Sequence, residues 1–572
     1  MSTMAKFNMS RYHVDIKTED LTNCCRIAIS GVQRAVQYYV NTRSIKDQIE
    51  DLICLLIVYR FLHNTVVVLY GYGPFRTVAG LYRQFAGNIT RRMLKLPILK
   101  EKVGQQVAGT RAMIENEFIN KPKGVSYSQI PNKGLSDTVL NHKLDILVDE
   151  KSANWKGGQV SGAVYFGDDK VAKLQADTYY KFCFANQLHP DAFPGVRQME
   201  AEVVSMVLNL FNAPESGCGT TTSGGTESLL LACLGAREKA YAEKGITEPE
   251  IIAPVSIHAA VFKASQYFKI KLRLVDLTDD FTVNIAQVKR LINRNTCLIM
   301  GSAPNFPYGT IDNIQALSDL AVSHNIPLHV DCCLGSFVVA YYSRAFGEEL
   351  PCFDFRCLGV TSISCDTHKY GFTPKGSSVI LYRNNDYRRY QYFISTEWTG
   401  GLYGSPTLAG SRPGALTAGT WATMLSIGND GYTKSCRAMV MAARELKRAV
   451  AEEIPALDVI GDPLVTVVAF KSEKLNVHSL NDRMTRRGWH LCALQKPAAI
   501  HLCVTRLSVT VIKELIEDLK ECVNELLEAD EELDSSTAQI YGVANSLTVG
   551  SIADDLISAF LDILYQDKKT AQ

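Results

Sequence analysis

The chain has 572 residues, a formal net charge of +1 and a hydrophobic fraction of 47%. At roughly 100–200 residues per domain this length predicts two to four domains, and the near-neutral charge gives no electrostatic reason to expect a nucleic-acid partner. The 16 cysteines include no C-x-x-C pair, which argues against a disulfide framework or a metal site and favours a reducing compartment. The N-terminal stretch is polar, so we predict no cleavable signal peptide.

Residues 52–70 are the one candidate membrane span in the sequence. As a helix this stretch is long enough for a hydrocarbon core of about 30 Å, but it contains Arg60, His63 and Asn64. A central arginine costs about 2.5–3.5 kcal/mol on insertion scales, whereas each Leu, Ile, Val or Phe returns only about 0.3–0.6 kcal/mol. The alternative is an amphipathic or buried helix, next to a basic segment that would hold the chain on an anionic membrane surface.

The charges that flank this stretch predict its orientation. Residues 1–51 are mixed in charge and are expected to be lumenal, whereas residues 71–160 form a basic juxtamembrane segment and a linker. The positive-inside rule then places the large C-terminal part in the cytosol. The basic residues that follow the span are Arg76, Arg83, Arg91, Arg92, Lys95, Lys100, Lys102 and Arg111.

Residues 161–410 are expected to form the catalytic domain, because short apolar strands alternate there with helical patterns. This alternation predicts an α/β fold with a mainly parallel sheet that is covered on both faces and binds ligands at the carboxyl ends of its strands. The expected strands are 251–254, 272–276, 297–301, 327–331 and 360–364, with a helix at 314–323.

Residues 411–572 are expected to form a smaller α+β C-terminal domain. Strand-like runs alternate there with amphipathic helical runs, and a last helix precedes a charged tail. The expected strands are 464–470 and 500–508, and the expected helices are 480–487, 511–528 and 552–565.

A lysine is presented between two apolar runs near the end of the expected catalytic domain. A β-branched run stops at Asp366, a turn rich in glycine and proline presents Lys369, and a second apolar run follows at 379–382. An amine held between two buried runs is suited to a Schiff base with a carbonyl cofactor. A lysine in an ordinary surface loop is the alternative.

Residues 222–228, TSGGTES, place glycines and hydroxyls at the start of a predicted helix. Free backbone N–H groups and the positive end of the helix dipole make such a start an anion site. The stretch matches neither a P-loop nor the G-x-G-x-x-G fingerprint of dinucleotide-binding proteins. An ordinary helix N-cap is the alternative.

Two further side chains follow predicted strands. Asp331 ends a strand and can keep a pyridinium nitrogen protonated, while His258 lies just past a strand and can stack on a ring. Each also has a structural explanation, as a strand-end carboxylate or a core histidine. Together with the lysine and the anion site, however, they are the parts that an enzyme dependent on pyridoxal 5′-phosphate needs.

From about residue 162 to the final helix the sequence resembles the sphingosine-1-phosphate lyases, a family of membrane-anchored enzymes with the aspartate aminotransferase-like fold (fold type I). DTHKYG followed by PKGSS is the most specific part, because decarboxylases of the wider group share only its His-Lys core. Cys332 and Cys365 stand where the family usually has alanine, and neither change removes a reactive group. The motifs are SGAVYFGDD (161–169), LHPDAFPG (188–195), TSGGTES (222–228), HAAVFKA (258–264), PLHVDCCLG (327–335), TSISCDTHKYGFTPKGSS (361–378) and SPTLAGSRPG (405–414).

The resemblance implies that Lys369 attaches the cofactor, that Asp331 pairs with its pyridine nitrogen and that His258 stacks on its ring. The other residues that the resemblance implies are Gly225, Thr226 and Ser364 for the cofactor phosphate, Tyr165 and Lys375 as catalytic residues facing the substrate, and Lys375, Tyr308 and Arg412 for a substrate phosphate.

The resemblance also implies a reaction, a retro-aldol cleavage of phosphorylated long-chain sphingoid bases to phosphoethanolamine and a fatty aldehyde. Lys369 or Tyr165 would supply the proton transfers. A homodimer and a single-pass anchor in the endoplasmic reticulum membrane, with the catalytic domain in the cytosol, are further expectations. The alternatives are a pyridoxal-phosphate amino-acid decarboxylase, which releases carbon dioxide from a small polar substrate, and a catalytically silent membrane scaffold.

Overall fold

The computed structural model describes residues 36–93, 127–148, 153–528 and 550–566, with a few single residues between 30 and 34 and between 96 and 115. The chain divides into two units, residues 1–70 and 71–572. The expected lumenal segment up to residue 29 and the basic residues Lys95, Lys100 and Lys102 lie outside the described residues.

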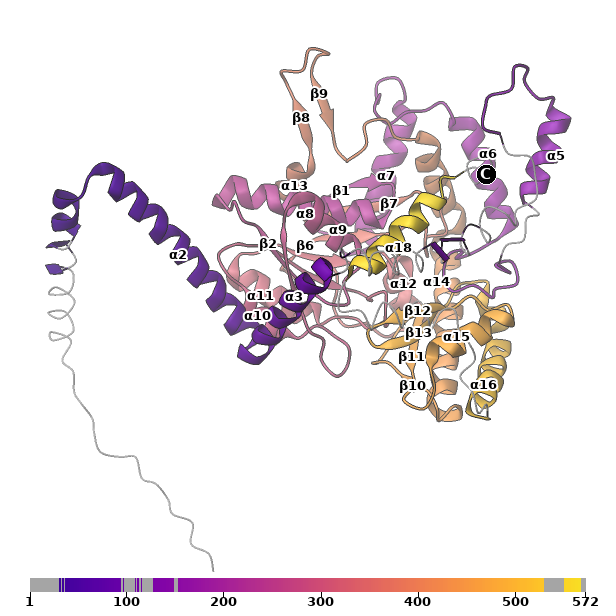
Figure 1. Ribbon diagram of the computed structural model, residues 1–572. Coiled ribbons are helices and arrows are strands. Elements are labelled where there is room, and N and C mark those ends of the chain that lie inside the picture. The colour runs from indigo at the N-terminus through magenta and orange to yellow at the C-terminus, as the bar shows by residue number, and fades with distance from the viewer. Residues whose placement is uncertain are drawn as a thin grey trace, which may run out of the picture. The chain divides into compact units, whose positions relative to one another are not determined.

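Helix α2, Ile45–Tyr72, contains the expected span and extends beyond it at both ends. An 18-residue window of this helix has a mean hydropathy of 2.0 and is not buried at all. At 1.5 Å per residue its 28 residues reach roughly 42 Å, so the helix is long and apolar enough to cross a membrane. It ends at Tyr72; the next residue, Gly73, has a φ of +79° that suits glycine, and helix α3, Pro74–Met93, begins directly after it (Figure 1).

A seven-stranded sheet forms the centre of the second unit, in the order β1-β7-β6-β5-β4-β2-β3. Only β7 runs antiparallel to its neighbours β1 and β6, so the prediction of a mainly parallel sheet is confirmed. Strand β1 has the sequence CGTTT, and the lack of large apolar side chains explains why it was not predicted. The strands are β1 Cys218–Thr222, β2 Glu250–Pro254, β3 Lys271–Val275, β4 Thr296–Ser302, β5 Leu328–Asp331, β6 Val360–Cys365 and β7 Ser378–Tyr382.

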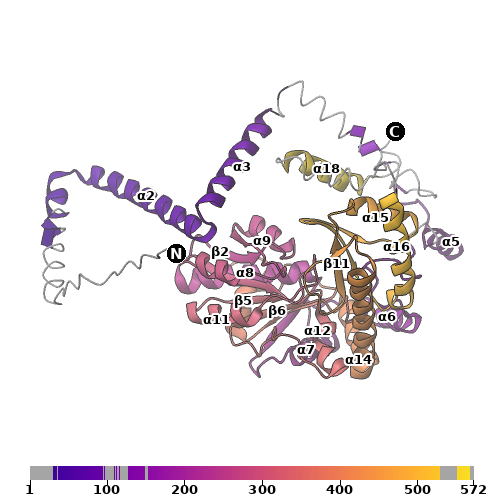
Figure 2. The same cartoon turned by 90° about the horizontal axis from the view of Figure 1, so that it is seen from below.

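Helices cover both faces of this sheet (Figure 2). The adjacent residues Ile251 and Ile252 of β2 belong to two different hydrophobic cores, because successive strand side chains point to opposite faces. Helices α8 and α9 contribute to one core, and α7, α10, α11, α12 and α14 contribute to the other. These helices are α7 Pro194–Leu210, α8 Gly225–Lys244, α9 Ala260–Phe268, α10 Ile285–Leu291, α11 Ile314–His324, α12 Ser336–Phe346 and α14 Gly414–Glu453.

A second, fully antiparallel sheet follows in the order β10-β11-β13-β12, as the predicted α+β character of this region requires. The strand predicted at 500–508 ends at Cys503, because Thr505 and Ser508 exchange hydrogen bonds in a turn: Thr505 N donates to Ser508 Oγ over 2.8 Å. The predicted boundary at residue 410 stays a prediction. The elements are β10 Asp458–Val459, β11 Val467–Lys471, α15 Val477–Arg486, β12 Cys492–Gln495, β13 Ala498–Cys503 and α16 Ile512–Glu528.

The remaining elements lie outside the two large sheets. A short hairpin of β8 and β9 connects the first sheet to α14. The last described helix, α18, begins and ends two residues earlier than predicted. These elements are α5 Asp137–Val148, α6 Asp169–Phe182, α13 Asn385–Arg388, β8 Phe393–Ser395, β9 Tyr403–Ser405 and α18 Gly550–Ile563.

Candidate active site

Four parallel strands lead into one cavity. The loops that follow the carboxyl ends of β1, β2, β5 and β6 enclose about 310 Å³, a volume within the range of small-molecule sites. The cavity wall includes Gly225, Thr226, His258 and Lys369, four of the residues predicted for the site, together with Asp366. The structure therefore places these four residues around one space, at the edge of the sheet where parallel folds bind ligands.

Lys369 lies on the turn directly after β6, beside a buried carboxylate. Its Nζ is 2.9 Å from Asp366 Oδ2, and Asp366 is only 2% exposed. Ser377 holds this turn through two contacts. Its Oγ shares a 2.6 Å hydrogen bond with Thr367 Oγ1, and its carbonyl oxygen lies 2.6 Å from His368 Nδ1. The amine is thus held at the cavity wall by a rigid turn.

The two charges of this pair control each other. Burial is the largest single influence and by itself would lower the pKa of Lys369, but the charge and hydrogen bond of Asp366, together with Cys333 and Asp331, outweigh burial, and the pKa of Lys369 lies above its usual value. Burial likewise would raise the pKa of Asp366, but the Lys369 ammonium, His368 and hydrogen bonds to the carboxylate together outweigh burial and lower that pKa. The pair is therefore ionic at neutral pH, and Lys369 becomes a nucleophile only when its proton leaves or the carboxylate is neutralised.

The glycine loop brings the start of α8 into contact with this pair. A Cβ atom on Gly225 would lie 2.7 Å from Cys333 Sγ and 2.8 Å from the Asp366 carboxylate oxygens, so only glycine allows this approach. No side chain caps the helix at Gly224, which leaves its first backbone N–H groups available at the positive end of the dipole. Both features suit an anionic group bound at the mouth of α8.

Glu227 holds the glycine loop in place. Its Oε2 accepts hydrogen bonds from Ser223 N and Ser223 Oγ, both 2.7 Å long, and its Oε1 accepts one from Leu408 N over 3.1 Å. The side chain is 8% exposed, and three donors satisfy its two oxygens. Glu227 therefore ties the loop after β1 to the loop after β9.

Asp331 and Ser364 form a second buried polar group at the ends of β5 and β6. Asp331 Oδ1 accepts from Cys333 N over 3.0 Å and from Ser364 Oγ over 3.4 Å, and Ser364 Oγ also lies 3.2 Å from His329 Nε2. Burial lowers the pKa of His329 to about 4, so this imidazole is neutral. Neither Asp331 nor Ser364 belongs to the cavity wall, although the charge of Asp331 acts on Lys369.

His258 has a defined orientation. Its Nδ1 accepts a hydrogen bond from Ala260 N over 3.1 Å, so the ring proton is on Nε2, and the ring meets Phe306 edge to face with centroids 6.4 Å apart. An acceptor role for Nδ1 fixes the ring plane at the cavity wall, as a stacking partner requires.

Tyr165 and Lys375 lie against each other. Lys375 Nζ is 4.9 Å from the centre of the Tyr165 ring. Burial, and then repulsion from Lys369, lower the pKa of Lys375, while burial raises the pKa of Tyr165 well above its usual value. Tyr165 is therefore a neutral phenol, and Lys375 interacts electrostatically with both members of the Lys369–Asp366 pair.

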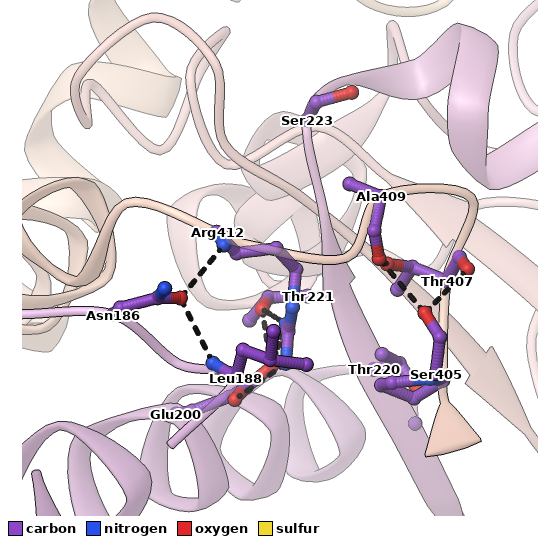
Figure 3. A network of polar contacts seen from close by, with 12 residues as sticks. Asn186, Leu188, Glu200, Thr220, Thr221, Ser223, Ser405, Thr407, Ala409 and Arg412 are labelled. Atoms are coloured by element: carbon purple, nitrogen blue, oxygen red, sulfur yellow. Dashed lines mark hydrogen bonds and ion pairs between the residues drawn. The ribbon is translucent and has the colours of Figure 1, made fainter. Parts of the chain in front are cut away.

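The structure does not bring Arg412 and Tyr308 to this cavity. Arg412 Nη1 lies 2.6 Å from Glu200 Oε1 and donates to Thr221 Oγ1 over 3.2 Å, so its charge is already paired (Figure 3). Tyr308 donates its hydroxyl to the carbonyl of Lys496 and packs in a small core of the second sheet. Neither residue belongs to the wall of the Lys369 cavity.

Sequence reasoning missed two groups of this site. Asp366 was used only as the end of a strand, although the spacing Asp-x-x-Lys is that of two side chains on one tight turn. Glu227 is the third residue of α8 after Gly224, the position from which a glutamate reaches back in a capping box. Among the residues that the structure describes, no cluster of three or more potential metal ligands is found.

Pyridoxal phosphate fits these groups. The cavity is large enough, the start of α8 offers N–H groups to a phosphate, and Lys369 offers an amine to an aldehyde. In addition, Asp366 Oδ1 is buried without a hydrogen-bond partner, as expected where a polar ligand completes a site.

Comparison with known proteins agrees with this geometry. The family model described as pyridoxal-dependent decarboxylase conserved domain matches residues 165–473. A sphingosine-1-phosphate lyase of Saccharomyces cerevisiae is 48% identical over 95% of this chain and 92% of its own length, and one of Drosophila melanogaster is 43% identical over 82% and 87%.

Two solved structures show the same fold. A sphingosine-1-phosphate lyase of Burkholderia pseudomallei superposes with a TM-score of 0.68 at 37% identity, over 73% of this chain and 97% of that one. A glutamate decarboxylase of Lactobacillus brevis superposes with a TM-score of 0.62 over 72% and 98%, but its 20% identity indicates the fold alone. This chain therefore belongs to the sphingosine-1-phosphate lyases, a family of enzymes within the pyridoxal-dependent decarboxylases.

Proposed function

We propose that this chain cleaves phosphorylated long-chain sphingoid bases to phosphoethanolamine and a long-chain aldehyde, with pyridoxal phosphate as cofactor. The observation that carries the proposal is the Lys369–Asp366 pair, which faces the glycine start of α8 across one cavity in a chain 48% identical to a named sphingosine-1-phosphate lyase. The amino-acid decarboxylase alternative rests on the fold alone, because the glutamate decarboxylase likeness is at 20% identity.

We assign the cofactor to residues around the cavity and just behind it. Lys369 would hold its aldehyde covalently, Gly225 and Thr226 its phosphate, His258 one face of its ring and Asp331 its pyridine nitrogen. Ser364 would support Asp331, to which it already donates a hydrogen bond. When bound, pyridoxal phosphate supplies the electron sink that accepts the electron pair of a breaking carbon–carbon bond.

The residues of the chain then have to move two protons. One proton leaves the C3 hydroxyl of the substrate and one is returned to C2, and we assign these transfers to Lys369 Nζ and Tyr165 Oη. Asp366 sets the protonation of the amine, because it favours the ammonium form. Lys375, beside Tyr165, is the cationic group that we assign to the phosphate of the substrate.

Product identification tests the reaction. Purified full-length protein with added pyridoxal phosphate is incubated in parallel with a phosphorylated sphingoid base and with glutamate, and products are identified by mass spectrometry. Phosphoethanolamine from the first substrate supports the proposal, whereas carbon dioxide release from glutamate alone refutes it. Borohydride reduction of the same protein should fix the cofactor to the peptide that carries Lys369, and a label on another lysine would refute the site.

We further propose that α2 anchors the enzyme by a single pass in the endoplasmic reticulum membrane, with the catalytic unit in the cytosol and two chains in a homodimer. The apolar length of α2 and the arginines that follow it support this orientation. A lipid substrate with its headgroup at the membrane surface also fits an anchored enzyme. Protease protection of microsomes tests the topology, and loss of the catalytic unit only after detergent treatment would contradict it.

A further inference from the structure

Helix α3 carries an apolar stripe that nothing in the described part of the chain covers. Six large side chains repeat at intervals of three or four residues, which places them along one face of an α-helix. Their exposed fractions run from 42% to 91%. Contiguous exposed apolar surface of this kind marks an interaction site. The stripe consists of Phe75, Val78, Tyr82, Phe85, Ile89 and Met93.

Apart from the exposed Leu81, the other large side chains of α3 are polar or basic. The helix has four arginines and neither an aspartate nor a glutamate. By helical geometry Arg83 and Arg92 flank the stripe on its two sides, while Gln84 lies opposite its centre. Apolar residues flanked by arginine are the pattern of a helix that lies in a membrane interface, with its basic side chains at the level of the lipid headgroups.

The position of α3 in the chain points to the same partner. The apolar helix α2 ends at Tyr72. Gly73 has a left-handed backbone conformation, and α3 begins at the following residue, Pro74. If α2 spans the bilayer, α3 therefore starts at the membrane surface. A second copy of the chain fits less well, because a symmetric contact between two stripes would bring arginines of both chains together with no acidic residue of α3 to pair them.

We propose that α3 lies in the plane of the membrane, with the stripe among the acyl chains and with Arg83 and Arg92 at anionic headgroups, while Arg76 keeps its ion pair with Asp276. This inference rests on the proposed anchoring by α2 and adds a second attachment. One helix that spans a bilayer leaves the catalytic unit free to swing, whereas an in-plane helix next to it holds that unit close to the surface. The headgroup of a lipid substrate is found at the same depth.

Single tryptophans report the depth of the two faces of α3. Full-length holoenzyme carrying Phe85→Trp, or Gln84→Trp as the matched control on the opposite face, is reconstituted into vesicles of phosphatidylcholine and phosphatidylserine. The fluorescence of the four native tryptophans is subtracted with the unsubstituted protein. Lipids brominated on their acyl chains should quench Phe85→Trp and leave Gln84→Trp unaffected. Equal quenching of both variants, or of neither, would overturn the proposal.

Charge gives a second readout. In the Phe85→Trp protein, adding Arg83→Gln should lower the ratio of membrane-inserted α3, which is quenched, to free α3, which is not, roughly five-fold in vesicles that contain phosphatidylserine. In vesicles of phosphatidylcholine alone the same substitution should change this ratio little. Lys513→Gln, an exposed basic residue on α16, is the control and should have no effect. Shielding of Phe85→Trp that persists in detergent and rises with protein concentration would assign the stripe to a second copy and overturn the membrane assignment.

Two measurements on the same samples separate this proposal from those on which it rests. Flotation with the vesicles after a carbonate wash reports the α2 anchor, and cleavage of a water-soluble short-chain sphingoid phosphate reports the reaction. A protein that floats and cleaves the soluble substrate, but leaves Phe85→Trp unquenched, refutes the in-plane helix alone.

Discussion

Replacing Asp366 by asparagine should raise the fraction of Lys369 that is present as a neutral, reactive amine. Asp366 Oδ2 lies 2.9 Å from Lys369 Nζ, and the Lys369 side chain is only 20% exposed. Against burial, which would lower the pKa of Lys369, this carboxylate makes the largest of the contributions that raise it above its usual value. In Asp366→Asn the shape of the site is kept and only the charge is lost, so burial is left to lower that pKa.

The size of the effect follows from the geometry. An opposite charge in direct contact moves a pKa by roughly one to three pH units, so the fraction of neutral Lys369 amine at pH 7 should rise roughly 10- to 1,000-fold in Asp366→Asn. Asp331→Asn should have a smaller effect, since Asp331 is the last and weakest of the charges that act on Lys369.

Competitive trace acetylation of the cofactor-free protein measures this change. The protein is treated with a trace of acetic anhydride across a pH series, and the acetylated peptide that contains Lys369 is quantified by mass spectrometry. Acetylation of the exposed Lys513 serves as internal control and should be the same in all variants. A midpoint for Lys369 that is the same in wild type and Asp366→Asn would refute the electrostatic account of the pair.

The ion pair also has a defined pH window. The raised pKa of Lys369 means that its contribution to stability is present at neutral pH and is lost as the pH rises through that pKa. The lowered pKa of Asp366 means that its contribution is present at neutral pH and is lost as the pH falls through that pKa. In Asp366→Asn, the losses of unfolding free energy that the pair causes at high pH and at low pH should both disappear.

Three further changes test other parts of the structure. Gly225→Ala should abolish retention of pyridoxal phosphate and destabilise the fold by about 1–3 kcal/mol in urea unfolding, because the added Cβ would lie 2.7 Å from Cys333 Sγ. Gly195→Ala, where the added Cβ has open space, serves as control. Equal effects of the two substitutions would contradict the packing argument. Glu227→Gln should speed hydrogen exchange of the Leu408 amide, which loses a charged acceptor, and unchanged exchange would show that the two loops are not coupled there. Burial lowers the pKa of His501 to about 4, so below the usual histidine pKa the unfolded chain binds a proton that the folded chain excludes. The free energy of unfolding should therefore fall by on the order of 3 kcal/mol as the pH falls from about 6.5 to about 4. His501→Gln should flatten this part of the stability profile, and an unchanged slope would contradict the assignment to His501.

Much of this protein follows from short-range pattern in the sequence. Of the four strands that lead into the cavity, β2, β5 and β6 were located to within one residue, since a buried parallel strand is a run of apolar residues bounded by turn residues, whereas β1 was not predicted. The glycines before α8 and the turn around Lys369 are local features in the same sense, because backbone sterics decide them. For this reason Gly225, Thr226, His258 and Lys369 could all be named before the structure was known.

Tertiary structure alone decided which charges meet. Arg412 pairs with Glu200, a residue 212 positions away, and this pairing removes it from the Lys369 cavity. Tyr308 is taken up by a backbone carbonyl 188 positions away. Asp366 was in view within the motif and its contact with Lys369 is local to one turn, but its burial depends on how β6 packs between β5 and β7. Apolar periodicity is a property of neighbouring residues, whereas the partner of a charge depends on which distant segments the fold brings together.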